Sequence, residues 1–463
     1  MSDKPVTVII SDLHLGGGAA DPGDDHVYQN NQLCRFIEKI PEASHGQVEL
    51  FINGDFLEFA QVKPEVFKPI SSKLWCSQDE SKEKLEAIIK GHKDIFDALN
   101  EFQGRSNQVT IAAGNHDVDL YWPDAREKLK AVIGDGLKFE LGKDAYFRYG
   151  QRLVIGHGHA YDPANSFKNW ADPIDKREQR LEMCPGTLFM VKFVNWLERD
   201  YGFSDNIKPV TALARILWGA NREDLKNAAK ILFQILYKNP LVALGIDKSG
   251  NMKGFSRSVL GELQTNPIFL KTVTELYRKA CDAGATTDVV KQKLNSEEQV
   301  TDFLKELLLR LEPDEWLPLI GAVGGGSLGT DSPTHLSIIH NGILNDKMML
   351  RQRANDYFAS GIPEAVVFGH THQPDEWRGL KGDWDGGYFN PGSWTRYVDL
   401  EKAPNLTIDD LKNESDFPFQ LNFIRVEQAQ SGKLRADKIC FEEQSGEKYG
   451  ATPRPSKFMD GSA

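Results

Sequence analysis

Residues 364–374 read EAVVFGHTHQP. The apolar run from Ala365 to Phe368 is typical of a buried β-strand, and it leads through one glycine into His370 and His372. Burying two imidazoles costs free energy unless they are paired or bind a metal ion. The stretch therefore predicts a strand whose end carries two metal ligands, which need partner ligands elsewhere in the chain.

Four earlier stretches have the same pattern of an apolar run that ends in Asp, Asn or His. They are PVTVIISDLHL (5–15), VELFINGDFLEF (48–59), QVTIAAGNHDVDL (108–120) and QRLVIGHGHAYD (151–162). Between the second and third stretches, the apolar residues of 81–102 recur with helical spacing. Strands that alternate with helices predict an α/β fold, and ligands of such sheets bind beyond the carboxyl ends of the strands.

Each predicted strand end carries side chains that can bind a metal ion. The candidates are Asp12, His14, Asp55, Asn115, His116, His157, His370 and His372. Carboxylate, amide and imidazole ligands together suit Mn, Fe or Zn better than Ca or Mg. One tetrahedral ion takes only four ligands, so the set is large enough for two adjacent ions that share a carboxylate.

The composition is that of an ordinary globular protein, with 40% hydrophobic and 26% charged residues. The formal net charge of −12 disfavours a general nucleic-acid binder, because an acidic surface repels a phosphate backbone. The five cysteines are scattered without a CxxC pair, as is typical of a reducing compartment. Since the sequence has neither a signal-peptide pattern nor a long apolar span, we expect a cytoplasmic protein without a transmembrane helix.

The segment 164–334 lacks the strand-and-ligand pattern and reads as successive amphipathic helices. The predicted helices are 187–202, 210–220, 222–239, 267–280 and 297–313. They are followed by the Gly-rich stretch GAVGGGSLGTDSP (321–333), which is typical of a hinge or linker. We therefore predict an α/β core made of 1–163 and 335–440, interrupted by a helical insertion and followed by a tail at 441–463. Within the core, 419–428 and 433–444 are expected to be antiparallel strands.

The ordered motifs resemble those of the calcineurin-like metallophosphoesterase superfamily. The chain contains DLH (12–14), GDFLE (54–58), GNHD (114–117), HGH (157–159) and GHTH (369–372), in the family's order. YFNPGSW (388–394) is similar to the family's strand and turn after GHxH. The resemblance implies a four-layer α-β-β-α sandwich. It covers the core but not the insertion, which is a candidate all-helical cap.

The resemblance also implies the roles of the individual residues in a phosphoester hydrolase with two divalent metal ions. One ion would be held by Asp12, His14, Asp55 and His372, and the other by Asp55, Asn115, His157 and His370. A hydroxide between the two ions would attack phosphorus. His116 would act as general acid on the leaving oxygen, Glu58 would orient His116, and His159 is a candidate substrate-binding residue.

Several activities share such a site. The main interpretation is hydrolysis of a small-molecule phosphomonoester, phosphodiester or pyrophosphate. The branch that hydrolyses UDP-2,3-diacylglucosamine typically has Arg where this chain has His116, and protein phosphatases have an arginine that GDFLE lacks. A DNA nuclease of the same superfamily would need a basic groove, which the net charge disfavours without excluding it. A scaffold that binds metal without catalysis would typically have lost ligands, and none is missing here.

The helical insertion is rich in aromatic residues, which include Phe189, Phe193, Trp196, Trp218, Phe233 and Trp316. A self-packed helical bundle accounts for most of them. Because the insertion leaves the core just after His159 and returns before the last metal strand, it is also a candidate lid over the site. It is equally a candidate surface for an apolar substrate or a protein partner.

Overall fold

The computed structural model describes residues 5–18, 30–44, 46–63, 66–67, 69, 74–162, 164–207, 213, 216–217, 220, 259–261, 263–296, 298–300, 302–303, 349–378, 387–398, 403 and 405–444. Over these residues the protein has the mixed α/β fold that the sequence predicted. The chain divides into two compact units. Unit 1 comprises Met1–Ile207, Lys347–Val398 and Asp409–Ala463, and unit 2 comprises Lys208–Asp346 and Asp399–Ile408. All the candidate site residues lie in unit 1.

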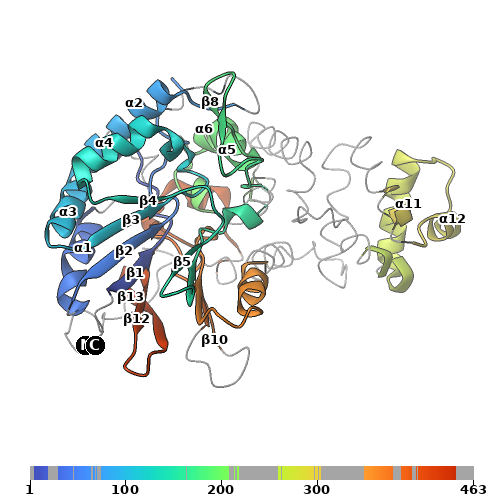
Figure 1. Ribbon diagram of the computed structural model, residues 1–463. Helices are drawn as coiled ribbons and strands as arrows, with labels where there is room; N and C mark the ends of the chain where they lie inside the picture. The colour runs from blue at the N-terminus through green and yellow to red at the C-terminus, as the bar shows by residue number, and fades with distance from the viewer. Residues whose placement is uncertain are drawn as a thin grey trace. The chain divides into compact units, whose positions relative to one another are not determined.

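Unit 1 contains a six-stranded sheet with the order β13-β12-β1-β2-β3-β4 (Figure 1). Its strands are β1 (Val6–Ile10), β2 (Val48–Asn53), β3 (Gln108–Ala112), β4 (Lys138–Glu140), β12 (Phe419–Gln428) and β13 (Leu434–Gln444). The first four run parallel to one another, whereas β12 pairs antiparallel with both β1 and β13. The antiparallel pair predicted for the C-terminal strands is thereby confirmed. Because β1, β2 and β3 are parallel, the motifs that follow them meet at one edge of the sheet.

A five-stranded sheet of unit 1 carries the other two motifs, and its order is β10-β11-β9-β6-β5. Its strands are β5 (Tyr146–Arg148), β6 (Leu153–Ile155), β9 (Ala365–Val367), β10 (Asp375–Arg378) and β11 (Gly387–Asn390). The three central strands β11, β9 and β6 are parallel. The HGH motif after β6 and the GHTH motif after β9 therefore leave the sheet at the same edge.

The two sheets face each other across a shared apolar cluster. It includes Ile9 of β1, Phe51 of β2, Ile155 of β6, Val367 of β9 and Ile424 of β12. The other face of each sheet is also buried. The ligand-bearing strands therefore read as continuous apolar runs rather than as an alternation of apolar and polar residues.

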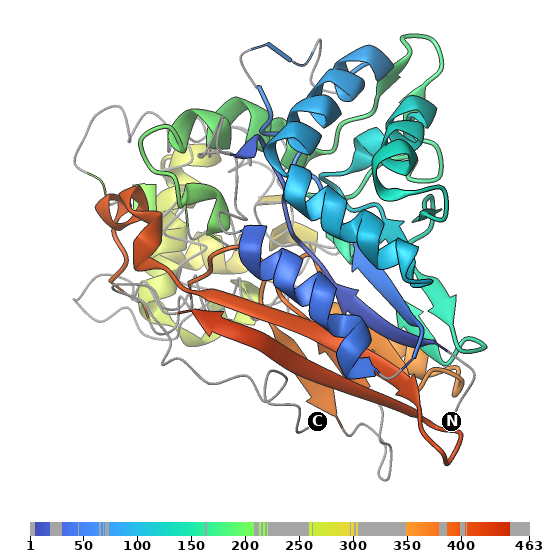
Figure 2. The same ribbon diagram turned by 90° about the vertical axis from the view of Figure 1, so that its left-hand side faces the viewer.

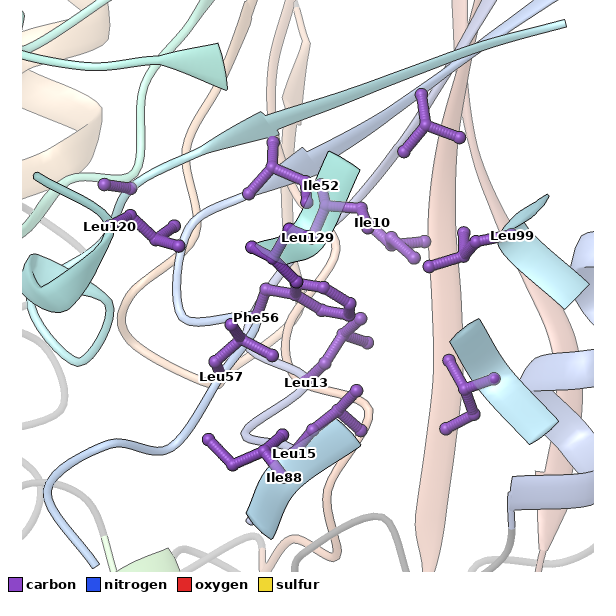
Figure 3. Packing of buried hydrophobic residues seen from close by; sticks show 14 of the residues in the cluster. Ile10, Leu13, Leu15, Ile52, Phe56, Leu57, Ile88, Leu99, Leu120 and Leu129 are labelled. Atoms are coloured by element: carbon purple, nitrogen blue, oxygen red, sulfur yellow. The ribbon is translucent and has the colours of Figure 1, made fainter. Parts of the chain in front are cut away.

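Four helices cover the outer face of the six-stranded sheet (Figure 2). They are α1 (Asn30–Ser44), α2 (Gln78–Gly91), α3 (Lys93–Gly104) and α4 (Pro123–Ile133). A second apolar cluster joins them to the sheet, and Figure 3 shows part of it, including Ile10, Ile52, Ile88 and Leu99. On the outer face of the five-stranded sheet, helical residues 349–358 contribute Leu350 and Ala354 to a third cluster with Val154, Val366 and Tyr388.

The helical segment predicted at 81–102 is divided into α2 and α3 at Gly91 and His92. The backbone of Gly17 and Gly18 packs against this break so closely that a Cβ on Gly91 would lie 2.7 Å from the carbonyl oxygen of Gly17. The apolar residues of 81–102 keep their helical spacing across the break, and the contact with Gly17 is distant in the sequence. The sequence therefore did not predict the break. Helix α2 starts with a capping box, in which Ser77 and Glu80 each accept the other's backbone N–H.

Residues 164–207 were assigned from the sequence to the all-helical insertion, but they belong to unit 1 and include two short strands. These are β7 (Ile174–Asp175) and β8 (Arg180–Leu181). The Asp175 carboxylate accepts the N–H groups of Arg177 and Glu178 and so stabilises the turn between them. The predicted helix at 187–202 is a shorter helical run, made of α5 (Pro185–Phe189), a π-helical turn η5 (Met190–Val194) and α6 (Asn195–Leu197).

Short 3₁₀ helices connect other elements. They are η3 (Val118–Tyr121), η4 (His159–Tyr161), η6 (Ser204–Asn206), η7 (Ile408–Lys412) and η8 (Glu414–Asp416). None of the helices among the described residues has the length and apolar character needed to cross a membrane.

The described part of unit 2 contains α11 (Pro267–Ala280), with the bounds that the sequence predicted, and α12 (Thr287–Lys293). An apolar cluster that includes Phe269, Val273, Val290 and Phe303 packs them together. The predicted helix 222–239, the Gly-rich stretch 321–333 and most of the helices 210–220 and 297–313 lie outside the described residues, as do Trp218, Phe233, Trp316 and tail residues 445–463. The boundaries predicted for the insertion stay predictions.

Candidate metal centre

The ends of β1, β2, β3, β6 and β9 bring the predicted metal ligands together in two groups. In each group the candidate ligand atoms lie within 4.8 Å of one another. The first group consists of Asp12, His14, Asp55 and His372, and the second of Asp55, His157 and His370. A third group that could hold an ion consists of His14, Glu58 and His116, of which only His14 was a predicted ligand. Asn115 joins the second group, because its Oδ1 lies 3.3 Å from His157 Nε2. Asp55 is the residue that the first and second groups share.

Backbone strain is concentrated at these residues. Asp12, His14, Asp55, His370 and His372 all have φ between 49° and 70°, a region that residues other than glycine rarely adopt. Each such conformation costs on the order of 1–3 kcal/mol and persists only where the surroundings impose it. Strain of this kind is typical of a functional site.

Two glycines of the motifs are required by the close approach of the ligands. A Cβ on Gly114 would lie 2.2 Å from Asp55 Oδ1, and a Cβ on Gly369 would lie 2.0 Å from Ser11 Oγ and 2.7 Å from Asp12 Oδ2. Real Cβ atoms do not approach other atoms this closely. Because these glycines have no side chain, they leave room for the carboxylates of Asp12 and Asp55 next to their backbone.

The nitrogen and oxygen atoms of the first group lie close enough together that they could hold a cation. His14 Nε2 lies 3.0 Å from His372 Nε2 and 3.8 Å from Asp55 Oδ2, and His372 Nε2 lies 3.4 Å from Asp12 Oδ1. The Nδ1–H of His14 donates to Glu58 Oε2 over 2.6 Å, which leaves the Nε2 lone pair for a metal ion. Burial lowers the pKa of His14, which favours the neutral form of its ring.

In the second group, two histidines also have one ring nitrogen fixed by a partner. The Nδ1–H of His157 donates to the Asn53 carbonyl over 2.9 Å, and its Nε2 lies 3.1 Å from Asp55 Oδ2. His370 uses the opposite nitrogen, because its Nε2 lies 3.0 Å from Asp162 Oδ2. The Nδ1 of His370 is shielded from solvent and has no hydrogen-bond partner, as expected of a nitrogen that binds an ion.

The charges of the site are strongly coupled. Burial alone would raise the pKa of Asp55, but His157, His116 and His14 together hold it well below its usual range. Burial alone would likewise lower the pKa of His157, but Asp55 and Asp12 raise it to about 9. Without a metal ion, His157 is therefore an imidazolium that donates through both nitrogens. A bound cation would take over the role of that proton.

His116 and Glu58 lie beside the first group. His116 Nδ1 is 2.9 Å from Glu58 Oε1, as expected if Glu58 orients His116. The same carboxylate also accepts from His14, which the sequence did not predict. Burial would raise the pKa of Glu58, but the two histidines lower it far below the ordinary value. Glu58 is therefore a buried carboxylate that holds two imidazoles by their Nδ1–H groups.

Several residues support the ligands, and among them Asp162, Asn165 and Asn390 were not assigned from the sequence. Asp117 accepts the backbone N–H groups of Leu57 and Gly114, so it ties two ligand turns together. Asp162 contacts His370 and Asn165 accepts from Asn115. Asn390 donates to the Gly369 carbonyl. The available signals were the positions of Asp162 at the end of QRLVIGHGHAYD and of Asn390 in YFNPGSW.

The predicted substrate-binding residue His159 lies beside the second group of candidate ligands. Its ring is buried, with its centroid 4.3 Å from that of Trp170 and 5.4 Å from that of His157. The structure thus places His159 next to a candidate ligand. A role in substrate binding stays a prediction.

No protein-family model matches this chain, and a search of the curated proteins finds no match either. What the site can do therefore follows from its donor atoms. Imidazole nitrogens mixed with carboxylate and amide oxygens suit divalent Mn, Fe and Zn. The fixed tautomers of His14 and His370 fit such ions, because each leaves one lone pair for coordination.

Proposed function

We propose that this protein is a phosphoester hydrolase that uses two divalent metal ions and belongs to the calcineurin-like metallophosphoesterase superfamily. The observation that carries the proposal is the division of the candidate ligands into two groups that share Asp55. Five motifs in the order of the family, from DLH at 12–14 to GHTH at 369–372, support it as well. The proposed substrate is a small-molecule phosphomonoester, phosphodiester or pyrophosphate.

The packing of unit 1 supports the finer fold assignment. We propose a four-layer α-β-β-α sandwich, because one apolar cluster contains residues of both sheets and two further clusters contain helical residues on their outer faces. The parallel strands that end in the motifs stand at the centre of both sheets. The helical insertion of this proposal, 164–334, includes residues 208–334 of unit 2.

Two bound Mn, Fe or Zn ions would activate water and neutralise charge on the phosphoryl group. Asp12, His14 and His372 would hold one ion, Asn115, His157 and His370 the other, and Asp55 both. The chain's contribution is to hold these donors in place. The hydrogen bonds of His14 to Glu58 and of His370 to Asp162 support this role.

His116 is the proposed proton donor to the leaving oxygen. Its Nδ1–H is engaged by Glu58, which leaves Nε2 as the nitrogen that can give a proton to substrate. The buried Glu58 carboxylate stabilises the positive charge of a protonated His116 ring. In this proposal the two groups that share Asp55 hold the ions, and Glu58 and His116 of the third group supply acid catalysis.

The test is turnover of generic esters by the purified protein. We expect hydrolysis of p-nitrophenyl phosphate or bis-p-nitrophenyl phosphate with added Mn, loss of activity in EDTA and recovery when Mn is restored. The preferred ester distinguishes a phosphomonoesterase from a phosphodiesterase. Elemental analysis provides the necessary control. Protein that contains two Mn ions and hydrolyses neither ester would contradict the proposal and favour a metal-binding scaffold.

A further inference from the structure

Asp162 is in contact with the second group of ligands without belonging to it. Its Oδ2 lies 3.0 Å from His370 Nε2 and accepts the side-chain N–H of Asn165. Its Oδ1 accepts the backbone N–H of Ala164 over 2.8 Å. A carboxylate with three such donors around it is held in one orientation and acts only as an acceptor.

The first consequence concerns His370. Because Asp162 can only accept, the hydrogen of the His370 ring must be on Nε2, and Nδ1 must carry the lone pair. That Nδ1 is shielded from solvent and has no partner. Asp162 therefore determines which nitrogen of His370 is available to a metal ion.

The second consequence concerns Asn115, through Asn165. Since the amide NH₂ of Asn165 faces Asp162, its Oδ1 is left to accept, and it accepts from Asn115 Nδ2 over 3.2 Å. The NH₂ of Asn115 is thereby directed to Asn165. Its Oδ1 then faces the site, 3.3 Å from His157 Nε2. One carboxylate thus sets the donor atom of two different ligands.

We propose that Asp162 and Asn165 are positioning residues for the second metal ion, with Asp162 fixing His370 directly and Asn165 passing the orientation on to Asn115. This inference rests on the proposed two-ion site. The first ion does not depend on the pair, because His14 is oriented by Glu58 instead. The ligands of the two ions are therefore oriented by different residues, and binding of the second ion can be weakened without affecting the first.

The decisive variant is Asp162→Asn, which has nearly the same shape but introduces an NH₂ group. That group must face His370, Asn165 or Ala164, each of which already presents a donor. We expect the Kd of the second Mn ion to rise about 10–100-fold, while the first stays as in the wild type. In electron paramagnetic resonance, the signal of a coupled Mn pair should give way to that of single ions. The matched control is Asp172→Asn, which removes an exposed carboxylate paired with Lys176.

Thermal unfolding of Asp162→Asn in EDTA will show whether this variant folds. If it does not, a second variant keeps the inference testable. Asn165→Ala removes only the relay to Asn115 and should weaken the second ion by a smaller factor. The inference would be overturned if Asp162→Asn bound both Mn ions with wild-type affinity and gave the signal of a coupled pair. If only Asn165→Ala folds, the same result in that variant would overturn it. So would a wild-type protein that binds a single Mn ion. A wild type that binds two ions and hydrolyses no ester would remove the proposed reaction but leave this inference intact.

Discussion

At the scale of single residues, Glu58 joins two histidines to which different tasks are assigned. Its Oε2 lies 2.6 Å from Nδ1 of His14, a proposed ligand, and 2.7 Å from Nδ1 of His116, the proposed acid. A change at Glu58 would disturb metal binding and proton transfer together. The two tasks are better separated by changing the histidines themselves.

His116→Ala should retain both metal ions and lower turnover by a factor of about 10²–10⁴, the range expected for loss of a general acid. The reason is that His116 belongs to neither ligand group that contains Asp55. Turnover of a generic ester and metal content of the same sample check the prediction. If His116→Ala purified without its metal ions, His116 would have to be a ligand and not the acid.

Asp55→Asn should lose metal ions from both groups, because one carboxylate is shared by them. The loss of its charge also removes the main attraction that keeps His157 protonated in the absence of metal. Elemental analysis after dialysis checks occupancy. Asp97→Asn, an exposed carboxylate paired with Lys93 on α3, is the control and should keep both ions. Full occupancy in Asp55→Asn would contradict the bridging assignment.

At the scale of elements, the turns after the strands determine where the ligands lie. The strained backbone of Asp12, Asp55 and His370 follows directly on β1, β2 and β9. Parallel strands direct these turns to one edge, and glycines without side chains let the turns approach each other. The site is therefore sensitive to atoms added to the turns as well as to the loss of ligands.

Gly369→Ala should destabilise the fold by about 1–3 kcal/mol, as expected for overpacking, and weaken metal binding. Its added methyl group would collide with Ser11 Oγ and Asp12 Oδ2 and displace a ligand of the first group. Thermal unfolding and Mn titration measure the two effects. The control is Gly104→Ala at the end of α3, where the added Cβ meets nothing within 4 Å. Equal behaviour of the two variants would argue against the close approach at Gly369.

The elements that carry the site could be predicted from the sequence because an apolar run followed by Asp, Asn or His is a local pattern. The strands before Asp12, Asp55 and His370 were found in this way. The relay from Asp162 through Asn165 could not be predicted, because it depends on side-chain orientations that are fixed only by tertiary contacts. The break between α2 and α3 could not be predicted for the same reason, because it depends on a backbone contact with Gly17, which is distant in the sequence.

At the scale of the whole molecule, the proposed ions join segments that are far apart in the chain. The first group combines Asp12 and His14 with His372, and the second combines His157 with His370. An ion that binds only the folded chain stabilises it by RT ln(1 + [L]/Kd), or about 2.7 kcal/mol at a free concentration of about 100 Kd. Metal binding should therefore be visible as global stability as well as activity.

This stabilisation should depend on pH in a defined direction. In the metal-free fold the pKa of His157 is raised to about 9, from an ordinary value of about 6.5. Its protonated form thus stabilises the metal-free fold fully below pH of about 6.5, and this contribution is lost as pH rises through about 9. An ion must displace that proton, so metal binding is weaker at low pH and strengthens as pH rises towards 9.

We therefore expect the melting temperature in Mn to exceed that in EDTA by a margin that grows between pH of about 6.5 and 8. Over the same range the affinity of the second ion should rise about tenfold per pH unit, since one proton is displaced from His157 per ion. Calorimetric titration in two buffers with different ionisation enthalpies measures the protons released. Asp172→Asn should behave as the wild type does. Release of no proton, with a melting-temperature difference independent of pH, would show that the ion does not replace the proton of His157.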